Sequence, residues 1–305
     1  MKAYLQQILF FLLLCLTCIV GLFFLVKAVF EKHNPFLFEN NINKIILGHS
    51  HAEAALDDQI LTNTVNLAHS ADGFFYSYVK LKESLKHNDN IDTLILAFTP
   101  TDISDNDARW TMDKAHLSSR LSKYIYFINP EDRKALQSYS NTWLLPLIIK
   151  SVPLEFSNLL RDRNRTKLRA QFGGYDPKET VLLKNGEESL NAEVQTDNEM
   201  SKLDDEYLRN IILLCKESSI NLILLNPPKF NDSRKDAVKQ AFESYRKDYS
   251  NEMTLIDCSS LVMPNGSYGD GTHLNDVGGE YFSNLIEQQG WKNLKRYCTT
   301  HSRNN

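Results

Sequence analysis

The chain has no surplus of positive charge. Its 34 Lys and Arg residues are outnumbered by 38 Asp and Glu residues, which gives a formal net charge of −4. Proteins that bind nucleic acids normally carry a basic surplus, so we expect no nucleic-acid partner. Internal repeats and low-complexity tracts are also lacking. A composition that is 42% hydrophobic and 24% charged predicts a folded globular protein.

The five cysteines lack the spacings of zinc sites and of redox motifs. Cys15 and Cys18 lie within an apolar run, whereas Cys215, Cys258 and Cys298 are far apart in the chain. This distribution predicts neither a disulfide framework nor a metal cluster, and we expect no metal or organic cofactor.

A long uncharged run is present near the N-terminus. Residues 8–26 read ILFFLLLCLTCIVGLFFLV, which is close to the length that a helix needs to cross a bilayer. A cleaved signal peptide would have a shorter apolar region and a small-residue cleavage site, and a lipoprotein would have a small residue before its cysteine. Neither pattern is found. We therefore predict an uncleaved transmembrane anchor over residues 1–30, followed by one domain over residues 31–305.

Apolar, strand-like segments alternate with helix-like segments after the anchor. The predicted strands are KIILG (44–48), TVNLA (64–68), TLILAFT (93–99), NLILLNPP (221–228) and MTLIDCS (253–259). Alternation of this kind implies a parallel sheet with helices on both faces. We predict a flavodoxin-like three-layer α/β/α sandwich with a parallel sheet of about five strands, preceded by the transmembrane helix.

A long, mostly helical insertion is predicted at about residues 103–202, between the third and fourth strands. Its apolar segment, residues 143–160, contains Lys150 and two prolines, so we expect insertion core rather than a second membrane span. An alternative is that this segment lies in the membrane interface or lines an acyl-donor groove. The basic stretch that follows, residues 161–169, is expected to be a solvated face, with contact to an anionic polymer or to headgroups as the alternative.

A serine follows the first predicted strand. The sequence KIILGHSHAEAAL (44–56) runs from this strand through Ser50 into a helical pattern. A serine hydroxyl becomes a nucleophile when an imidazole takes its proton, a carboxylate orients the imidazole and amide groups stabilise the oxyanion. In open parallel sheets, ligands bind beyond the carboxyl ends of the strands. We therefore expect Ser50, Asp102 and Asn226 to converge on one edge.

The general base has to be a histidine close to Ser50. The candidates are His49, His51, His69 and His273. The two histidines adjacent to the serine are expected to point away from its side chain, and His69 is expected to form local hydrogen bonds. Asp270 and His273 lie three residues apart in the loop sequence YGDGTHLNDVGGEYF (268–282), after the last strand and at the same sheet edge. A polar turn that caps the last helix is the alternative interpretation of this loop.

Together, the motifs Gly48-His49-Ser50 and Asp270-Gly-Thr-His273 resemble those of the SGNH (GDSL-like) hydrolase family. The resemblance covers residues 44–290 without the insertion. The first block of the family usually reads Gly-Asp-Ser, and its last block, Asp-x-x-His, is matched in full. This resemblance implies that Ser50 is the nucleophile, His273 the general base and Asp270 the residue that orients the base.

The middle blocks of the family are matched less closely. VNLAHSADG (65–73) resembles the second block, in which a glycine amide contributes to the oxyanion hole; here Ala71 or Ser70 takes that position. The third block, Gly-x-Asn-Asp, has no counterpart, and FTPTD (98–102) stands in its place. The residues that we expect to substitute for its side-chain donor are Thr99, Thr101 or Asn226.

The anchor, the second block and the sequence His-Leu-Asn followed by Gly-Gly are similar to membrane-anchored members of the family. These act in teichoic-acid D-alanylation and exopolysaccharide acetylation. This resemblance implies a serine esterase or O-acyltransferase of acyl, mainly acetyl, esters on cell-envelope polysaccharide. It also implies a membrane-bound acyltransferase as a partner. The domain is expected outside the cytoplasmic membrane because of this resemblance, since Lys2 on one side of the run and Lys27 and Lys32 on the other do not orient the anchor.

Two other functions remain open at this point. Because the third block is missing, the chain is alternatively a catalytically inactive scaffold or binding protein of envelope-polymer machinery. A metal-dependent hydrolase that uses His49 and His51 as ligands is a further alternative, although no acidic or histidine group has recognisable ligand spacing around them.

Overall fold

We describe the protein from a computed structural model. The structure describes residues 1–100, 102, 111–140, 144–161, 164–179, 201–230, 235–249 and 253–303. The chain forms two compact units. One comprises Met1–Pro35 and Met112–Gln171, and the other comprises Phe36–Thr111 and Phe172–Asn305. The middle part of the predicted insertion, Met112–Gln171, therefore groups with the N-terminal helix.

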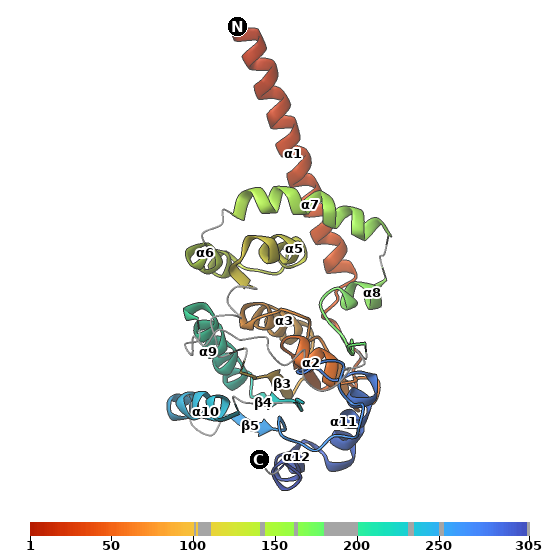
Figure 1. Ribbon diagram of the computed structural model, residues 1–305. Helices are drawn as coiled ribbons and strands as arrows, with labels where there is room; N and C mark the ends of the chain where they lie inside the picture. The colour runs from red at the N-terminus through yellow and green to blue at the C-terminus, as the bar shows by residue number, and fades with distance from the viewer. Residues whose placement is uncertain are drawn as a thin grey trace. The chain divides into compact units, whose positions relative to one another are not determined.

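The second unit is built on a five-stranded parallel sheet (Figure 1). Its strands are β1 (Lys44–Leu47), β2 (Thr64–Asn66), β3 (Thr93–Ala97), β4 (Asn221–Asn226) and β5 (Met253–Asp257). The strand order is β2-β1-β3-β4-β5, and every neighbouring pair is parallel. This is the flavodoxin-like order, so the predicted fold class is confirmed.

Helices cover both faces of the sheet. On one face lie α2 (Ser50–Ala55), α11 (Asp276–Gln289) and α12 (Trp291–Thr300), and on the other lie α3 (Phe74–His87), α9 (Lys202–Glu217) and α10 (Lys235–Tyr249). The strands are apolar at successive positions because both of their faces are buried. Ile46, Ile95 and Ile223 pack into the core beneath α2 and α11. Their neighbours Ile45 and Leu94 are equally buried and point to the opposite face.

The described residues of the first unit are helical where they form regular structure. Its helices are α1 (Lys2–Lys32), α5 (Lys114–Tyr124), α6 (Pro130–Tyr139), α7 (Leu144–Arg161) and α8 (Arg165–Ala170). Within this unit α7 packs against both α1 and α5. Among the described residues, α1 is the one helix that is long and apolar enough to cross a membrane, and it contains the predicted span. The predicted insertion also includes residues 103–110 and 180–200, which lie outside the described residues.

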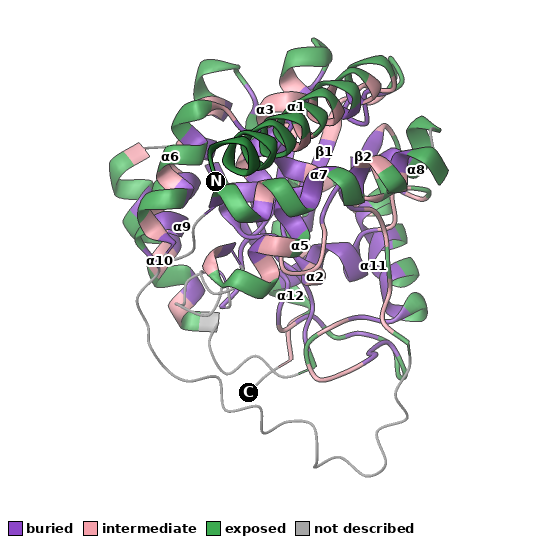
Figure 2. Ribbon diagram, turned by 90° about the horizontal axis from the view of Figure 1, so that it is seen from above, coloured by how far each residue is buried: buried purple, intermediate pink, exposed green. Residues whose placement is uncertain are grey.

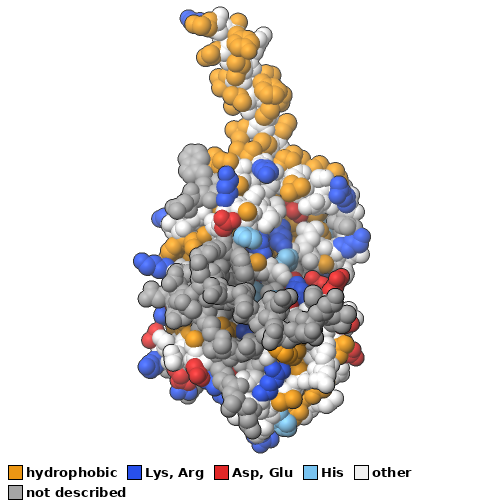
Figure 3. All heavy atoms as spheres, viewed as in Figure 1, with side chains coloured by type: hydrophobic (Ala, Val, Ile, Leu, Met, Phe, Trp, Pro, Cys, Tyr) orange, Lys and Arg blue, Asp and Glu red, His pale blue; other side chains and the backbone are white. Residues whose placement is uncertain are grey.

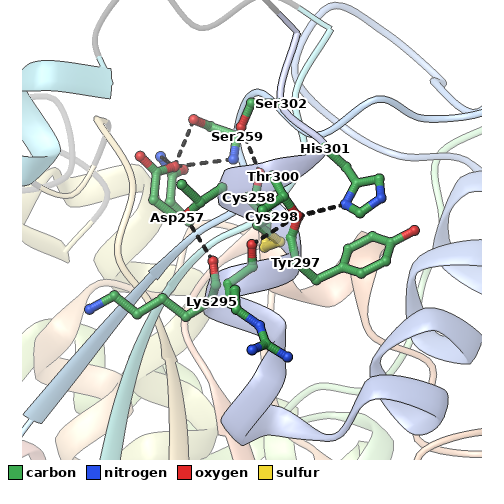
Figure 4. Close-up of a disulfide and its surroundings, with 12 residues drawn as sticks. Asp257, Cys258, Ser259, Lys295, Tyr297, Cys298, Thr300, His301 and Ser302 are labelled. Atoms are coloured by element: carbon green, nitrogen blue, oxygen red, sulfur yellow. Dashed lines mark hydrogen bonds between the residues drawn. A yellow bond between two sulfur atoms is a disulfide. The ribbon is translucent and has the colours of Figure 1, made fainter.

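A disulfide joins Cys258, directly after β5, to Cys298 in α12 (Figure 4). The prediction that the cysteines form no disulfide is therefore wrong for this pair. The two residues are 40 positions apart, and they meet because α12 packs beside β5. Cys15, Cys18 and Cys215 are free thiols.

Candidate active site

Ser50 lies where β1 turns into α2. Gly48, the residue after β1, has a φ of 121°, and a Cβ atom there would lie 2.4 Å from the Cβ of Ala97 in β3. Only glycine fits this close approach and this backbone conformation. His49 is the N-cap of α2, so Ser50 is the first helical residue, at the carboxyl end of the sheet.

The structure brings Ser50, His273 and Asp270 together. Ser50 Oγ lies 2.8 Å from His273 Nε2, and His273 Nδ1 lies 2.8 Å from Asp270 Oδ2. A carboxylate at Nδ1 places the proton on that nitrogen and leaves Nε2 free to accept the serine proton. This arrangement has the connectivity of a catalytic triad.

A tight turn holds Asp270 in place. Its Oδ1 accepts backbone N–H hydrogen bonds from Thr272 at 2.7 Å and from His273 at 2.8 Å. Burial favours a raised pKa for Asp270, but the hydrogen bonds from His273 and Thr272 outweigh it and hold the pKa well below its usual range. The loop also caps α11, because Asn275 accepts the Gly278 N–H. The triad and capping interpretations of this loop are therefore compatible.

His51 lies beside His273, and no hydrogen bond joins its side chain to Ser50 among the described residues. Its ring stacks on that of His273, with ring centroids 4.5 Å apart. His49 points elsewhere, and its Nε2 lies 3.0 Å from Asp102 Oδ2. The sequence contains no signal for this stack, because it depends on how the last loop returns to α2.

Hydrogen bonding assigns the tautomers of these histidines. His49 donates its Nε2–H to the Asp102 carboxylate, so its Nδ1 accepts from His51, whose Nδ1 is 3.1 Å away. The Nε2 atom of His51 is buried and has no hydrogen-bond partner among the described residues. Burial lowers the pKa of His51 well below its ordinary value, with further lowering from Lys229, His49 and His273.

Ser70 and Ala71, the predicted oxyanion residues of the second block, form the centre of a turn. The Asp72 N–H donates to the His69 carbonyl at 3.0 Å, and Ala71 has a φ of 57°. This left-handed conformation favours glycine. The Ser70 hydroxyl donates to Glu53 of α2, so the turn is tied to the helix that carries Ser50.

The substitutes expected for the third block are engaged elsewhere. The Thr99 N–H donates to Asp102 Oδ2 at 2.6 Å, and its Oγ1 lies 3.2 Å from His49 Nε2. Asn226 is fully buried and donates to Asp257 Oδ1 at 3.2 Å. Thr101 lies outside the described residues. Among the described residues, no hydrogen bond joins Thr99 or Asn226 to Ser50.

Residues 172–179, which we call the strap, run along the site and were assigned to the insertion by sequence alone. The backbone N–H groups of Gly174, Asp176 and Lys178 donate to the carbonyls of Ala68, Glu53 and Leu274, respectively. The strap therefore joins the second block, α2 and the histidine loop. The pair Gly173-Gly174 was the sequence signal that could have revealed it.

A fully buried lysine fixes the start of the strap. Lys80 of α3 donates to Asp72 Oδ2 at 2.9 Å and to the carbonyls of Leu67 and Phe172. A buried ammonium group is tolerated because a carboxylate and two carbonyl oxygens surround it. Lys80 thus links the strap to the turn that contains Ala71.

The described residues contain no group of three or more His, Cys, Asp or Glu side chains placed to hold a metal ion. His49 and His51, the ligands of the metal-dependent alternative, point their Nδ1 atoms at each other. The unit that carries the sheet also contains a cavity of about 470 Å³ beside the edge strand β5. It is lined by α10 and α12 and not by Ser50, His273 or Asp270. It belongs to a different part of the sheet.

Comparison of the chain with protein-family models, curated proteins and solved structures finds no match. The case for a functional site therefore depends on the geometry of the residues described above.

Proposed function

We propose that the chain is a membrane-anchored, SGNH-like serine esterase or O-acyltransferase that acts on acyl, mainly acetyl, esters of cell-envelope polysaccharide. The observation that carries the proposal is the continuous hydrogen-bonded series from Ser50 through His273 to Asp270 at the carboxyl edge of a parallel sheet. A chance surface serine would not have both partners in this order.

The reaction proceeds in two halves. Ser50 Oγ attacks the ester carbonyl carbon while His273 Nε2 accepts the hydroxyl proton, and the imidazolium is stabilised by Asp270. The C–O bond of the ester then breaks, and His273 returns the proton to the departing alcohol. A water molecule or a sugar hydroxyl next attacks the acyl carbon while His273 takes its proton. The bond between the acyl carbon and Ser50 Oγ then breaks, and His273 returns the proton to Oγ.

The turn that contains Ser70 and Ala71 is the proposed source of oxyanion-hole N–H groups. The left-handed φ of Ala71 reproduces the conformation that a glycine would adopt there. Its link to α2 through Glu53 and its support by Lys80 keep this turn in a fixed position beside the nucleophile helix. Rigid N–H donors stabilise developing negative charge without the cost of reorganisation.

The disulfide supports a location outside the cytoplasm for the catalytic unit. Disulfides persist in oxidising compartments and are rare in the cytosol. Cys258 and Cys298 both lie in the unit that carries the triad. With α1 as a membrane anchor, the proposed site then faces the periplasm or cell surface, where a membrane-bound acyltransferase partner could supply the acyl group.

A fluorophosphonate probe tests the proposal directly. The full chain in detergent would be treated with the probe and weighed as intact protein, alongside Ser50→Ala and His273→Ala. A matched control is Ser119→Ala, which removes an exposed serine of α5. Labelling of wild type and of the control, but not of the other two variants, is expected. A folded wild type that does not react would contradict an activated serine.

A catalytically inactive scaffold is the second candidate. It is favoured by the missing third block and by the hydrogen bonds that occupy Thr99 and Asn226 elsewhere. If the chain is a scaffold, Ser50→Ala should leave the acylation level of the envelope polymer unchanged in cells. The enzyme function requires that level to change.

A further inference from the structure

Helix α7 presents an apolar stripe on its exposed side. The stripe consists of Leu145, Ile149, Pro153, Phe156 and Leu160. These residues follow one another at spacings of four, four, three and four, so they form one line along four turns of helix. Leu145 is 58% exposed and Leu160 is 55% exposed, whereas Leu147, Val152 and Leu159 on the other side are buried. Within the described part of the chain, the side with Leu147, Val152 and Leu159 packs against protein, and the stripe is largely exposed.

The stripe lies on the unit that contains the candidate membrane span. Within this unit α7 lies across α1 and contacts it (Figure 1). The first residue of α1 to be buried is Val26, and its preceding turns are largely exposed (Figure 2). The uncharged run, residues 8–26, makes about 28 Å of helix, which is close to the hydrocarbon thickness of a bilayer.

Aromatic contacts show where the free part of α1 ends. Phe23 packs on Tyr126 with ring centroids 5.0 Å apart, and Phe30 packs on both Tyr126 and Phe127. This aromatic cluster begins near the C-terminal end of the uncharged run, close to the headgroups, where a Tyr such as Tyr126 is favoured. Figure 3 shows apolar side chains along α1 and continuing where α1 joins the rest of its unit.

The charge of α7 also fits a lipid surface. Its exposed charged side chains are Lys150 and Arg161, which are 11 residues apart and so lie on the same side of the helix. Its one acidic residue, Glu155, is buried. A helix with a continuous apolar stripe bordered by basic side chains is typical of a helix that lies in the membrane interface.

We propose that α7 lies in the plane of the bilayer surface that α1 spans, with its stripe among the acyl chains and Lys150 and Arg161 at the lipid phosphates. This inference rests on the proposed membrane anchoring by α1 and does not depend on catalysis. The first unit then contacts the bilayer in two ways, through α1 across it and through α7 along its surface. Together these contacts fix the height and tilt of the unit relative to the membrane, which a single spanning helix does not.

Spin-label accessibility tests the position of α7 in the full chain. The free cysteines would be replaced (Cys15→Ser, Cys18→Ser, Cys215→Ala) with the disulfide retained. A nitroxide would be placed at Ile149→Cys or Leu160→Cys. Leu12→Cys in α1 reports the span, and Glu280→Cys, on the exposed side of α11, is the aqueous control. Each variant is reconstituted into nanodiscs of phosphatidylcholine and phosphatidylglycerol, and relaxation by oxygen and by a soluble nickel chelate is measured.

At Ile149 and Leu160 we expect the accessibility ratio to shift toward oxygen, as at Leu12, whereas Glu280 favours nickel. Nickel accessibility at the two α7 positions equal to that at Glu280 would overturn the inference while leaving the anchor intact. Exclusion of both reagents would also overturn it, because the stripe would then be covered by protein. Nickel accessibility at Leu12 as well would overturn the anchoring itself.

Discussion

The two histidines that flank Ser50 have different roles. His49 lies against a carboxylate, because Asp102 Oδ2 is 3.0 Å from its Nε2. His51 is held neutral and stacked on His273. In the proposed reaction, this neutral ring adds no competing positive charge beside the imidazolium that forms on His273.

Replacement of Asp270 tests the orientation of the base. Asp270→Asn keeps the shape but loses the charge and can impose the wrong tautomer on His273, so kcat for an aryl acetate should fall by about 10³- to 10⁴-fold. KM should change little, because Asp270 does not bind the substrate. Asp276→Asn, a nearby exposed carboxylate in the first turn of α11, is the control and should retain activity. A loss of less than about tenfold for Asp270→Asn would mean that another group orients His273.

The neutral state of His51 predicts an acid-side loss of stability. In the unfolded chain His51 takes up a proton near the ordinary histidine pKa of 6.5, but in the folded chain its pKa lies well below that value. The stability is therefore complete above about pH 6.5 and falls as the pH drops toward the folded pKa, by up to about 1.4 kcal/mol per pH unit. His51→Asn retains a donor for His49 but does not titrate.

Urea unfolding of wild type and His51→Asn at pH 7.5, 6.5 and 5.5 measures this effect. As the pH falls, the free energy of unfolding should decrease more for wild type than for His51→Asn. Parallel pH profiles would contradict the lowered pKa, because His51 would then bind as many protons in the folded state as in the unfolded state.

At the scale of elements, the strap decides how the separate blocks of the site meet. It adds no strand or helix, and it forms backbone hydrogen bonds to the second block, to α2 and to the histidine loop. Its entry is crowded, because a Cβ atom on Gly173 would lie 2.4 Å from the carbonyl oxygens of both Leu67 and Ala68. Close backbone approach of this kind requires glycine.

Two neighbouring glycines separate crowding from backbone strain. Gly173→Ala introduces both a clash and a φ of 141° that L-residues rarely adopt, so we expect a destabilisation of about 3 kcal/mol or more. Gly174→Ala has an unfavourable φ of 156° but open space around the new Cβ, so only about 1–2 kcal/mol is expected. Urea unfolding measures both variants. Equal losses would mean that the strap can move away from Leu67 and Ala68 at little cost.

For the whole molecule, the covalent link between β5 and α12 closes a loop of 40 residues. By loop-closure entropy such a link contributes about 4 kcal/mol of stability. It also joins the C-terminal helix to the edge strand of the sheet that carries the site (Figure 4).

Thiol counting tests both the disulfide and the location of the unit. Full-length protein extracted from membranes and denatured without reductant should expose three reactive thiols, from Cys15, Cys18 and Cys215, and five after reduction. Protein retained in the cytoplasm by deletion of α1 should give equal counts in both conditions, because the cytosol keeps thiols reduced. Five thiols in the membrane-extracted protein without reductant would contradict an oxidising location.

Local patterns were sufficient for much of this protein. The uncharged run predicted the candidate span within α1, since bilayer crossing depends on the length and polarity of one segment. Alternating apolar segments predicted all five strands and their parallel arrangement, because strands buried on both faces are continuously apolar. The resemblance of Asp270-Gly-Thr-His273 to the last SGNH block predicted the contact between these two side chains, which three residues within one turn allow.

Only the tertiary structure decided the contacts between distant segments. The disulfide Cys258–Cys298, the stack of His51 on His273 and the hydrogen bonds of the strap each join segments that are far apart in the sequence. The exposure of the α7 stripe also depends on which elements pack against α7. Sequence spacing does not relate these segments. Residue types and local periodicity determine which elements form, because the forces involved act over a few residues. Which side chains then meet depends on how those elements pack, and this is settled by burial across the whole chain.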